Sequence, residues 1–233
     1  MIARAAEAGL ERICVPGWDL ASSEGALELA SRHPGIVDAA VGVHPHHAAE
    51  VDEPRWARLE ALVADPRTAA VGEIGLDYFR NLSPPEVQRE AFERQLAIAA
   101  GNGLPALVHD RDAHEGVTST LLAWGGRGVL HAFSGDAAMA RSLTAAGFVV
   151  SFALPVAFGS AAGPRAAAIA LVEGTFLVET DAPYLGPDAS RRNEPTTVLR
   201  VVSELARLRG VDAATLVTPI RGVYEGLIRP LSG

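Results

Sequence analysis

Apolar positions along the chain fall into two kinds of segment that follow one another in turn. Short runs rich in Val, Ile and Phe each precede a longer stretch in which apolar residues recur at helical spacing. Continuous apolar strands that alternate with amphipathic helices are typical of a parallel sheet buried on both faces. The predicted strands are Arg12–Val15, Ala39–Val43, Ala69–Ile74, Ala106–Val108, Val129–Ala132, Phe148–Phe152 and Phe176–Glu179. Their spacing of roughly 20–35 residues is that of successive βα units.

Helix start and stop signals agree with this pattern. Ser83-Pro84-Pro85-Glu86 places Pro in the first turn of a helix, and Gly101-Asn102-Gly103 ends that helix. The predicted helices are Glu24–Ser31, Arg55–Val63, Pro85–Ala100, Ala113–Ala123, Ala137–Ala146, Ala166–Leu171 and Thr197–Leu208. No linker rich in Pro, Ser or charge divides the chain, so we predict a single domain over residues 1–233.

Polar side chains gather where the predicted strands end. They are His44 and His46 after the second strand, Glu73 and Asp77 at the third, His109 at the fourth, His131 at the fifth and Asp181 at the seventh. In a (β/α)8 barrel the carboxyl ends of the strands converge on one face, whereas an open doubly wound sheet spreads them along an edge. The gathering favours the barrel, although a barrel needs eight strands and about 250 residues.

The chemistry that these residues favour is metal binding. Imidazole and carboxylate ligands suit Zn²⁺, Mn²⁺ or Fe²⁺, whereas carboxylates alone favour Mg²⁺. A bound divalent metal lowers the pKa of water and stabilises charge on a phosphoryl or carbonyl oxygen. A single His after a strand is more often a hydrogen-bonded loop residue than a ligand. The repetition at strand ends nevertheless favours Glu73, His109, His131 and Asp181 as one site.

Composition excludes several classes of protein. With 48% hydrophobic and 21% charged residues, the chain is an ordinary globular one. A net charge of −8 argues against sequence-independent coating of nucleic acid, and the single Cys14 excludes a disulfide framework. All 20 basic residues are Arg, which removes Lys-based mechanisms. We expect a soluble cytoplasmic protein, because no apolar run approaches the ~18–20 residues that span a membrane and the start lacks the apolar region of a signal peptide.

Five stretches of sequence, in register, resemble the TatD-type metal-dependent deoxyribonucleases. They are Gly42-Val43-His44-Pro45-His46, Gly72-Glu73-Ile74-Gly75-Leu76-Asp77-Tyr78, Val108-His109-Asp110-Arg111-Asp112-Ala113, His131-Ala132-Phe133-Ser134-Gly135 and Glu179-Thr180-Asp181-Ala182-Pro183-Tyr184. Arg192-Asn193-Glu194-Pro195 and the helix with Gln88, Phe92 and Gln95 match further family motifs. The resemblance implies an amidohydrolase-type TIM (β/α)8 barrel and hydrolysis of DNA phosphodiesters. It also implies that Glu73, His109, His131 and Asp181 are metal ligands.

The start of the chain departs from the family pattern. The family begins with a strand that ends in a His-x-His pair, whereas this sequence begins inside the helix that follows, at about Ile2–Ala8. The barrel therefore lacks its first strand, with seven strands visible, and the chain is expected to be N-terminally truncated. The family holds two divalent ions, from Mg²⁺, Mn²⁺ or Zn²⁺. Here one half-site is complete, with Glu73, His109 and His131, and the other keeps only Glu73 and Asp181.

Two other segments differ from the family. Leu154, Ala157 and Gly159 stand where the family usually has Gly, Thr and Lys, so we expect substrate contact there to be altered. Pro219 lies in the region of the last helix and is expected to limit it.

The leading hypothesis is an enzyme that cleaves DNA phosphodiesters. In it Asp181 and Glu73 are catalytic, with Asp181 as general base, and His44 and His46 contact substrate. Arg111 or Arg192 holds a phosphate. One alternative is an ester or amide hydrolase on the same metal barrel, since a metal acting as a Lewis acid polarises a carbonyl oxygen as well as a phosphoryl oxygen. Another is a catalytically impaired protein that lacks the His-x-His ligands. We expect DNA as the substrate, no membrane and no stable protein partner.

Overall fold

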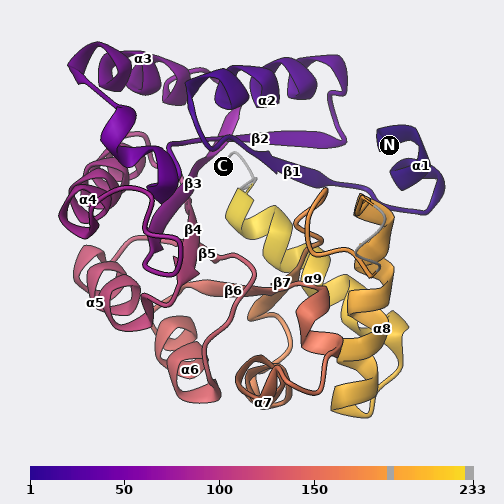
Figure 1. The fold of residues 1–233 in the computed structure, drawn as a ribbon. Helices are drawn as coiled ribbons and strands as arrows, with labels where there is room; N and C mark the ends of the chain where they lie inside the picture. The colour runs from indigo at the N-terminus through magenta and orange to yellow at the C-terminus, as the bar shows by residue number, and fades with distance from the viewer. Residues whose placement is uncertain (188–191, 229–233) are drawn as a thin grey trace. The chain divides into compact units, whose positions relative to one another are not determined.

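The computed structural model describes residues 1–187 and 192–228. By its internal contacts the chain divides into two compact units. The N-terminal unit is Glu11–Val129, and the C-terminal unit joins Met1–Leu10 to Leu130–Gly233. Strands and helices alternate along the described residues, which confirms the predicted α/β class (Figure 1). Seven strands lie in this part of the chain, the number that was predicted. That residues 1–233 form a single domain stays a prediction.

The sheet of the N-terminal unit contains β1 (Ile13–Pro16), β2 (Val37–Val41), β3 (Thr68–Asp77) and β4 (Ala106–Arg111). These strands are parallel and pair in chain order. All of β2 and most of β3 are buried, as expected for a parallel sheet covered on both faces. Because the strands are parallel, the residues at their carboxyl ends lie at one edge of this sheet.

The helices of the N-terminal unit begin at side-chain caps. Asp19 accepts a hydrogen bond from the amide of Ser22 at 2.7 Å and so starts α2 (Leu20–Arg32). Asp52 accepts one from the amide of Arg55 at 3.1 Å and starts α3 (Glu53–Val63) in the same way. The remaining helical elements are η1 (Pro45–Glu50), α4 (Pro85–Gly101) and α5 (His114–Trp124).

The C-terminal unit is built around paired strands and an aromatic cluster. β6 (Val149–Phe152) and β7 (Phe176–Val178) are parallel neighbours. The rings of Phe133 and Phe152 meet edge to face at 6.2 Å, and those of Phe152 and Phe176 at 5.9 Å. The short strand β5 (Gly128–Leu130) connects the two units along the chain. The helical elements are α1 (Ile2–Glu7), α6 (Ala137–Ala145), η2 (Leu154–Ala157), α7 (Ala162–Ala170), η3 (Pro195–Thr197), α8 (Val198–Arg209) and α9 (Ala213–Ile228).

The expectation that Pro219 limits the last helix is wrong. α9 runs through Pro219 as one helix from Ala213 to Ile228. A proline inside a helix removes one backbone hydrogen bond, at a cost of about 3 kcal/mol. Helices in proteins are stabilised mainly by burial of an apolar face, and α9 buries Leu216 and Leu227 where it packs against α8 and β7. Tertiary packing therefore outweighs the local effect of Pro219.

Among residues 1–187 and 192–228, no helix combines the length and the apolar character that crossing a membrane requires.

Candidate metal centre

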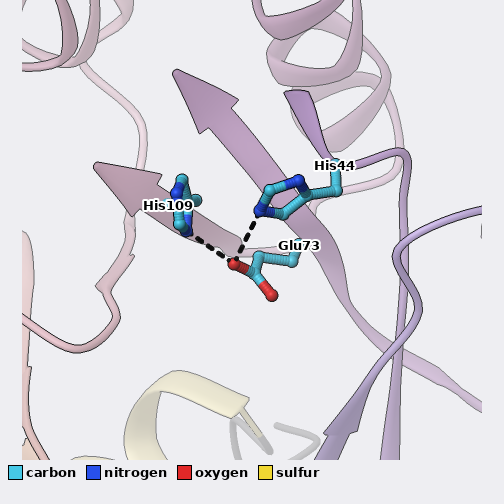
Figure 2. A group of neighbouring side chains, drawn as sticks. All are labelled: His44, Glu73 and His109. Carbon is cyan, nitrogen blue, oxygen red and sulfur yellow. Dashed lines mark ion pairs between the residues drawn. The ribbon is translucent and has the colours of Figure 1, made fainter. Parts of the chain in front are cut away.

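Three side chains of the N-terminal unit converge on one point. His44 follows β2, Glu73 lies in β3 and His109 lies in β4, and Figure 2 shows both imidazole rings turned toward the same carboxylate oxygen. His109 Nδ1 lies 2.8 Å from Glu73 Oε1, and His44 Nε2 lies 3.4 Å from the same atom. The three ligand atoms all lie within 4.8 Å of one another. Such a set of two imidazoles and one carboxylate is a common ligand set for a divalent transition metal.

Close contact between β3 and β4 places Glu73 beside His109. A Cβ atom on Gly72 would lie 2.5 Å from the Cβ of Leu107, so only glycine fits there. Gly75 has a φ of +135°, and a Cβ atom on it would lie 2.0 Å from the carbonyl oxygen of His109. These two glycines of the Gly72-Glu73-Ile74-Gly75 stretch therefore permit the approach of the strands that creates the site.

His44 is held in place by a buried glutamine of α4. The amide of Val43 donates to Gln95 Oε1 at 2.7 Å, and Gln95 Nε2 donates to the Val43 carbonyl at 3.0 Å. The amide of His44 itself donates to the Trp18 carbonyl at 2.9 Å. Gln95 is buried, and its amide group satisfies both backbone groups of the residue before the ligand.

Asp77, at the end of β3, orients the imidazole of His109. Its Oδ2 lies 3.2 Å from His109 Nε2 and 2.8 Å from His46 Nε2. Gln88 fixes the backbone of Asp77, because Asp77 N–H donates to Gln88 Oε1 at 2.9 Å. Burial raises the pKa of Asp77, but hydrogen bonds from His109, the Arg80 amide and His46 outweigh it and hold that pKa well below the usual value.

The protonation of these groups fits a bound cation. A proton on Nε2 of His109 directed at Asp77 would leave the lone pair of Nδ1 facing Glu73, where a metal would bind. Burial lowers the pKa of His44, although its hydrogen bond with Glu73 opposes that effect. A neutral imidazole is the form that binds metal. The residues present therefore fit a divalent metal.

The other predicted ligands lie in the C-terminal unit. His131 follows β5 and its Nδ1 lies 3.1 Å from Glu179 Oε1, an atom that also accepts the amide of Ala132 at 3.0 Å. Asp181 adopts a left-handed backbone conformation with φ of 53°. Buried Asn193 holds this loop, donating to the Thr180 carbonyl at 2.7 Å. A left-handed non-glycine residue costs roughly 1–2 kcal/mol, so the backbone conformation of Asp181 lowers the free energy of unfolding.

The structure thus brings together Glu73 and His109 of the predicted ligand set. The joint set of Glu73, His109, His131 and Asp181 stays a prediction. His44, which sequence patterns assigned to substrate, lies 3.4 Å from Glu73 and belongs to the group of side chains that could hold a metal; its substrate role stays a prediction. Its position after a strand end was the signal that could have identified it.

The predicted substrate-binding residues have different surroundings. His46 pairs with Asp77. Arg111 stacks over the ring of Phe79, with its guanidinium carbon 4.2 Å from the ring centroid. Arg192 is exposed, and Arg191 beside it lies outside the described residues. The substrate roles of these groups stay predictions.

Comparison with known proteins places the chain among metal-dependent hydrolases. Residues 1–227 match the family model described as TatD related DNase. A protein of Erwinia tasmaniensis called 3'-5' ssDNA/RNA exonuclease TatD is 38% identical in an alignment 226 residues long, and the match covers 93% of this chain and 87% of that protein. The uncharacterized metal-dependent hydrolase YabD of Bacillus subtilis is 36% identical, with 90% and 84% covered.

A solved structure shares the fold. The crystal structure of YJJV, a TatD homologue from Escherichia coli, superimposes with a TM-score of 0.91 at 26% sequence identity. The match covers 97% of this chain and 90% of the other. The predicted TIM-barrel type of fold is therefore confirmed.

Proposed function

Because this chain belongs to the TatD-related DNase family, we propose that it hydrolyses phosphodiester bonds of single-stranded DNA, with a divalent metal held by His44, Glu73 and His109. The observation that carries the proposal is the convergence of both imidazoles on Glu73 Oε1, at 2.8 and 3.4 Å. The name of the Erwinia relative, an exonuclease of single-stranded DNA and RNA, supports the substrate class.

Each residue has a separate task in this reaction. A divalent cation, when bound, supplies positive charge that stabilises a phosphoryl oxygen and lowers the pKa of water. His44, Glu73 and His109 would hold that cation, and Asp77 keeps the His109 ring in the tautomer that leaves Nδ1 unprotonated. The Asp181 carboxylate accepts the proton of the attacking water. His131 and Asp181 complete the ligand set, and the metal is Mg²⁺, Mn²⁺ or Zn²⁺.

The substrate is held by side chains at the ends of the strands. His46 lies beside Asp77 and so next to the metal ligands, where it can donate to a phosphate oxygen. Arg192, which is exposed, provides a cation for the strand backbone.

The test compares release of nucleotides from end-labelled single-stranded DNA by the chain after chelation and after addition of Mg²⁺, Mn²⁺ or Zn²⁺. We expect cleavage only with metal, and a loss of at least 100-fold in Glu73→Gln, since removal of a ligand costs more than the roughly 10–100-fold of outer groups. Glu90→Gln, which neutralises an exposed carboxylate on α4, serves as the matched control and should behave as the native chain.

An ester or amide hydrolase on the same ligands is the competing function. Assays of esters, lactones and DNA under the same metal conditions separate the two. Turnover of an ester without cleavage of DNA would contradict the proposal, as would equal rates in native chain and Glu73→Gln.

A further inference from the structure

An aromatic ring and a cation are stacked on the surface beside the metal centre. Phe79 is 60% exposed, and the Arg111 guanidinium carbon lies 4.2 Å from the centroid of its ring. The neighbouring side chains Tyr78 and Leu82 are exposed as well. A single exposed apolar side chain needs no explanation. A cluster of them, with a guanidinium fixed against the ring, forms a flat surface of the kind that binds planar ligands.

The stacked pair is fixed to the same two strands that carry the metal ligands. Gly75 pairs with His109 across β3 and β4. Two residues further along both strands, Asp77 pairs with Arg111. The amide of Tyr78 donates to the Arg111 carbonyl at 2.9 Å, which ties the start of the Phe79 loop to β4. Two residues along a strand span about 6.6 Å. Arg111 therefore begins one such step from His109, and Phe79 stacks on it, within reach of a nucleotide next to the one being cleaved.

The charge of the chain makes stacking the more important source of affinity. With a net charge of −8, the protein as a whole gives little electrostatic attraction for the phosphates of a strand. Proteins that bind single strands add base stacking on aromatic rings and on arginine to backbone contacts. Only unpaired bases offer their faces in this way, since a duplex covers them.

We propose that Phe79, with Arg111 stacked on it, is a platform for one base of a single-stranded nucleic acid whose backbone lies at the metal centre. The proposal rests on the proposed function for the class of ligand. It also extends the predicted role of Arg111. A guanidinium that stacks through its flat face keeps its N–H donors at the edge, so Arg111 supports the Phe79 ring with its face while its edge meets the adjoining phosphate.

The first experiment pairs loss of the ring with loss of single bases. A set of single-stranded oligonucleotides carries one abasic site, moved stepwise from the end, and KM and kcat are measured with Mn²⁺ for the native chain, Phe79→Ala and Phe79→Tyr. In the native chain we expect one abasic position to raise KM by about 5- to 150-fold, the range for loss of one stacked base. Phe79→Ala should show the same rise with the intact strand and no further rise at that abasic position. Phe79→Tyr should restore the native behaviour.

The second experiment needs no cleavage. 2-Aminopurine is placed at each position of a strand with phosphorothioate linkages, and its fluorescence is followed on binding in the presence of Mn²⁺. Quenching at one position in the native chain, lost in Phe79→Ala and kept in Phe79→Tyr, supports the platform. The matched control is Leu122→Ala, which removes another exposed apolar side chain, 43% exposed on α5, and should change neither assay. Thermal unfolding confirms that each variant is folded.

Several outcomes would overturn the platform. In the first, Phe79→Ala has the same kinetics as Leu122→Ala. In the second, Phe79→Ala and the abasic site raise KM independently of one another at every position. In the third, the quenching of 2-aminopurine depends on the exposed ring of Trp18 instead of Phe79. Failure of the proposed function would give a different result, namely no cleavage of any strand by the native chain. The fluorescence assay still decides the platform in that case.

Discussion

Asp77 Oδ2 lies 3.2 Å from Nε2 of His109, the ring nitrogen that does not face Glu73. In the proposed metal centre, this contact keeps the ring proton on Nε2. Nδ1, 2.8 Å from Glu73, is then the atom that would bind the metal. A carboxylate behind a histidine ligand also raises the basicity of the ring. Asp77 is therefore a positioning residue that acts through His109.

The first prediction concerns this contact. In Asp77→Asn the amide no longer holds the His109 proton on Nε2, so the affinity for Mn²⁺ should fall by about 10- to 100-fold. Titration calorimetry measures this directly. Glu90→Gln, on the exposed face of α4, should keep the native affinity. An unchanged affinity in folded Asp77→Asn would show that the contact is only structural.

The second prediction concerns Gln95. Replacement by Leu leaves the amide and carbonyl of Val43 without their buried partners, and each such group costs about 1–3 kcal/mol. We expect the free energy of unfolding to fall by about 2–4 kcal/mol and Mn²⁺ affinity to fall with it, because the residue after Val43 is a ligand. Glu93→Ala on the same helix, an exposed position, is the control. Loss of stability without any loss of metal affinity would contradict the link to His44.

The third prediction concerns glycine. Gly75→Ala places a Cβ 2.0 Å from the His109 carbonyl in a backbone conformation that alanine avoids, so β3 and β4 must separate. This variant should lose more than about 3 kcal/mol of stability and bind no metal at the site. Gly25→Ala in α2, where a Cβ meets nothing within 4 Å, should instead gain about 0.5–1 kcal/mol. Denaturant unfolding measures the free energy of unfolding of both variants. Equal changes in Gly75→Ala and Gly25→Ala would contradict the prediction.

The fourth prediction concerns Pro219. Since α9 continues through this residue, Pro219→Ala adds a backbone N–H to an intact helix and should stabilise the chain by about 1–3 kcal/mol. Calorimetric unfolding measures the change, and hydrogen exchange should show slower opening of α9. A less stable variant would mean that the proline ring itself contributes essential packing.

Sequence patterns located the strands and helices because burial on both faces of a parallel sheet leaves a strong local signal. The third strand extends beyond its predicted end at Ile74 to Asp77, since polar Asp77 pairs with Arg111 across the sheet. The extent of α9 was underestimated because a local rule for proline was weighed without the burial of Leu216 and Leu227. Tertiary contact of this kind leaves no mark within a short window of sequence.

Sequence patterns predicted which residues gather at the site better than they predicted the role of each residue. Glu73 and His109 were identified because each lies toward the carboxyl end of a strand, and parallel strands bring these ends together. His44 was assigned to substrate, and the structure adds that it lies beside Glu73, because no sequence pattern separates a metal ligand from its neighbour. What places it at Glu73 is Gln95, a residue far along the chain that fixes the backbone of Val43. The side chains that orient a ligand in this way are found only from the three-dimensional structure.

The most direct test of the metal centre is anomalous diffraction from crystals of the chain grown with Mn²⁺. The account predicts a peak within about 2.0–2.2 Å of ligand atoms of His44, Glu73 and His109, and its disappearance in crystals of Glu73→Gln. Manganese peaks that avoid these three residues, or a peak that persists in Glu73→Gln, would contradict it.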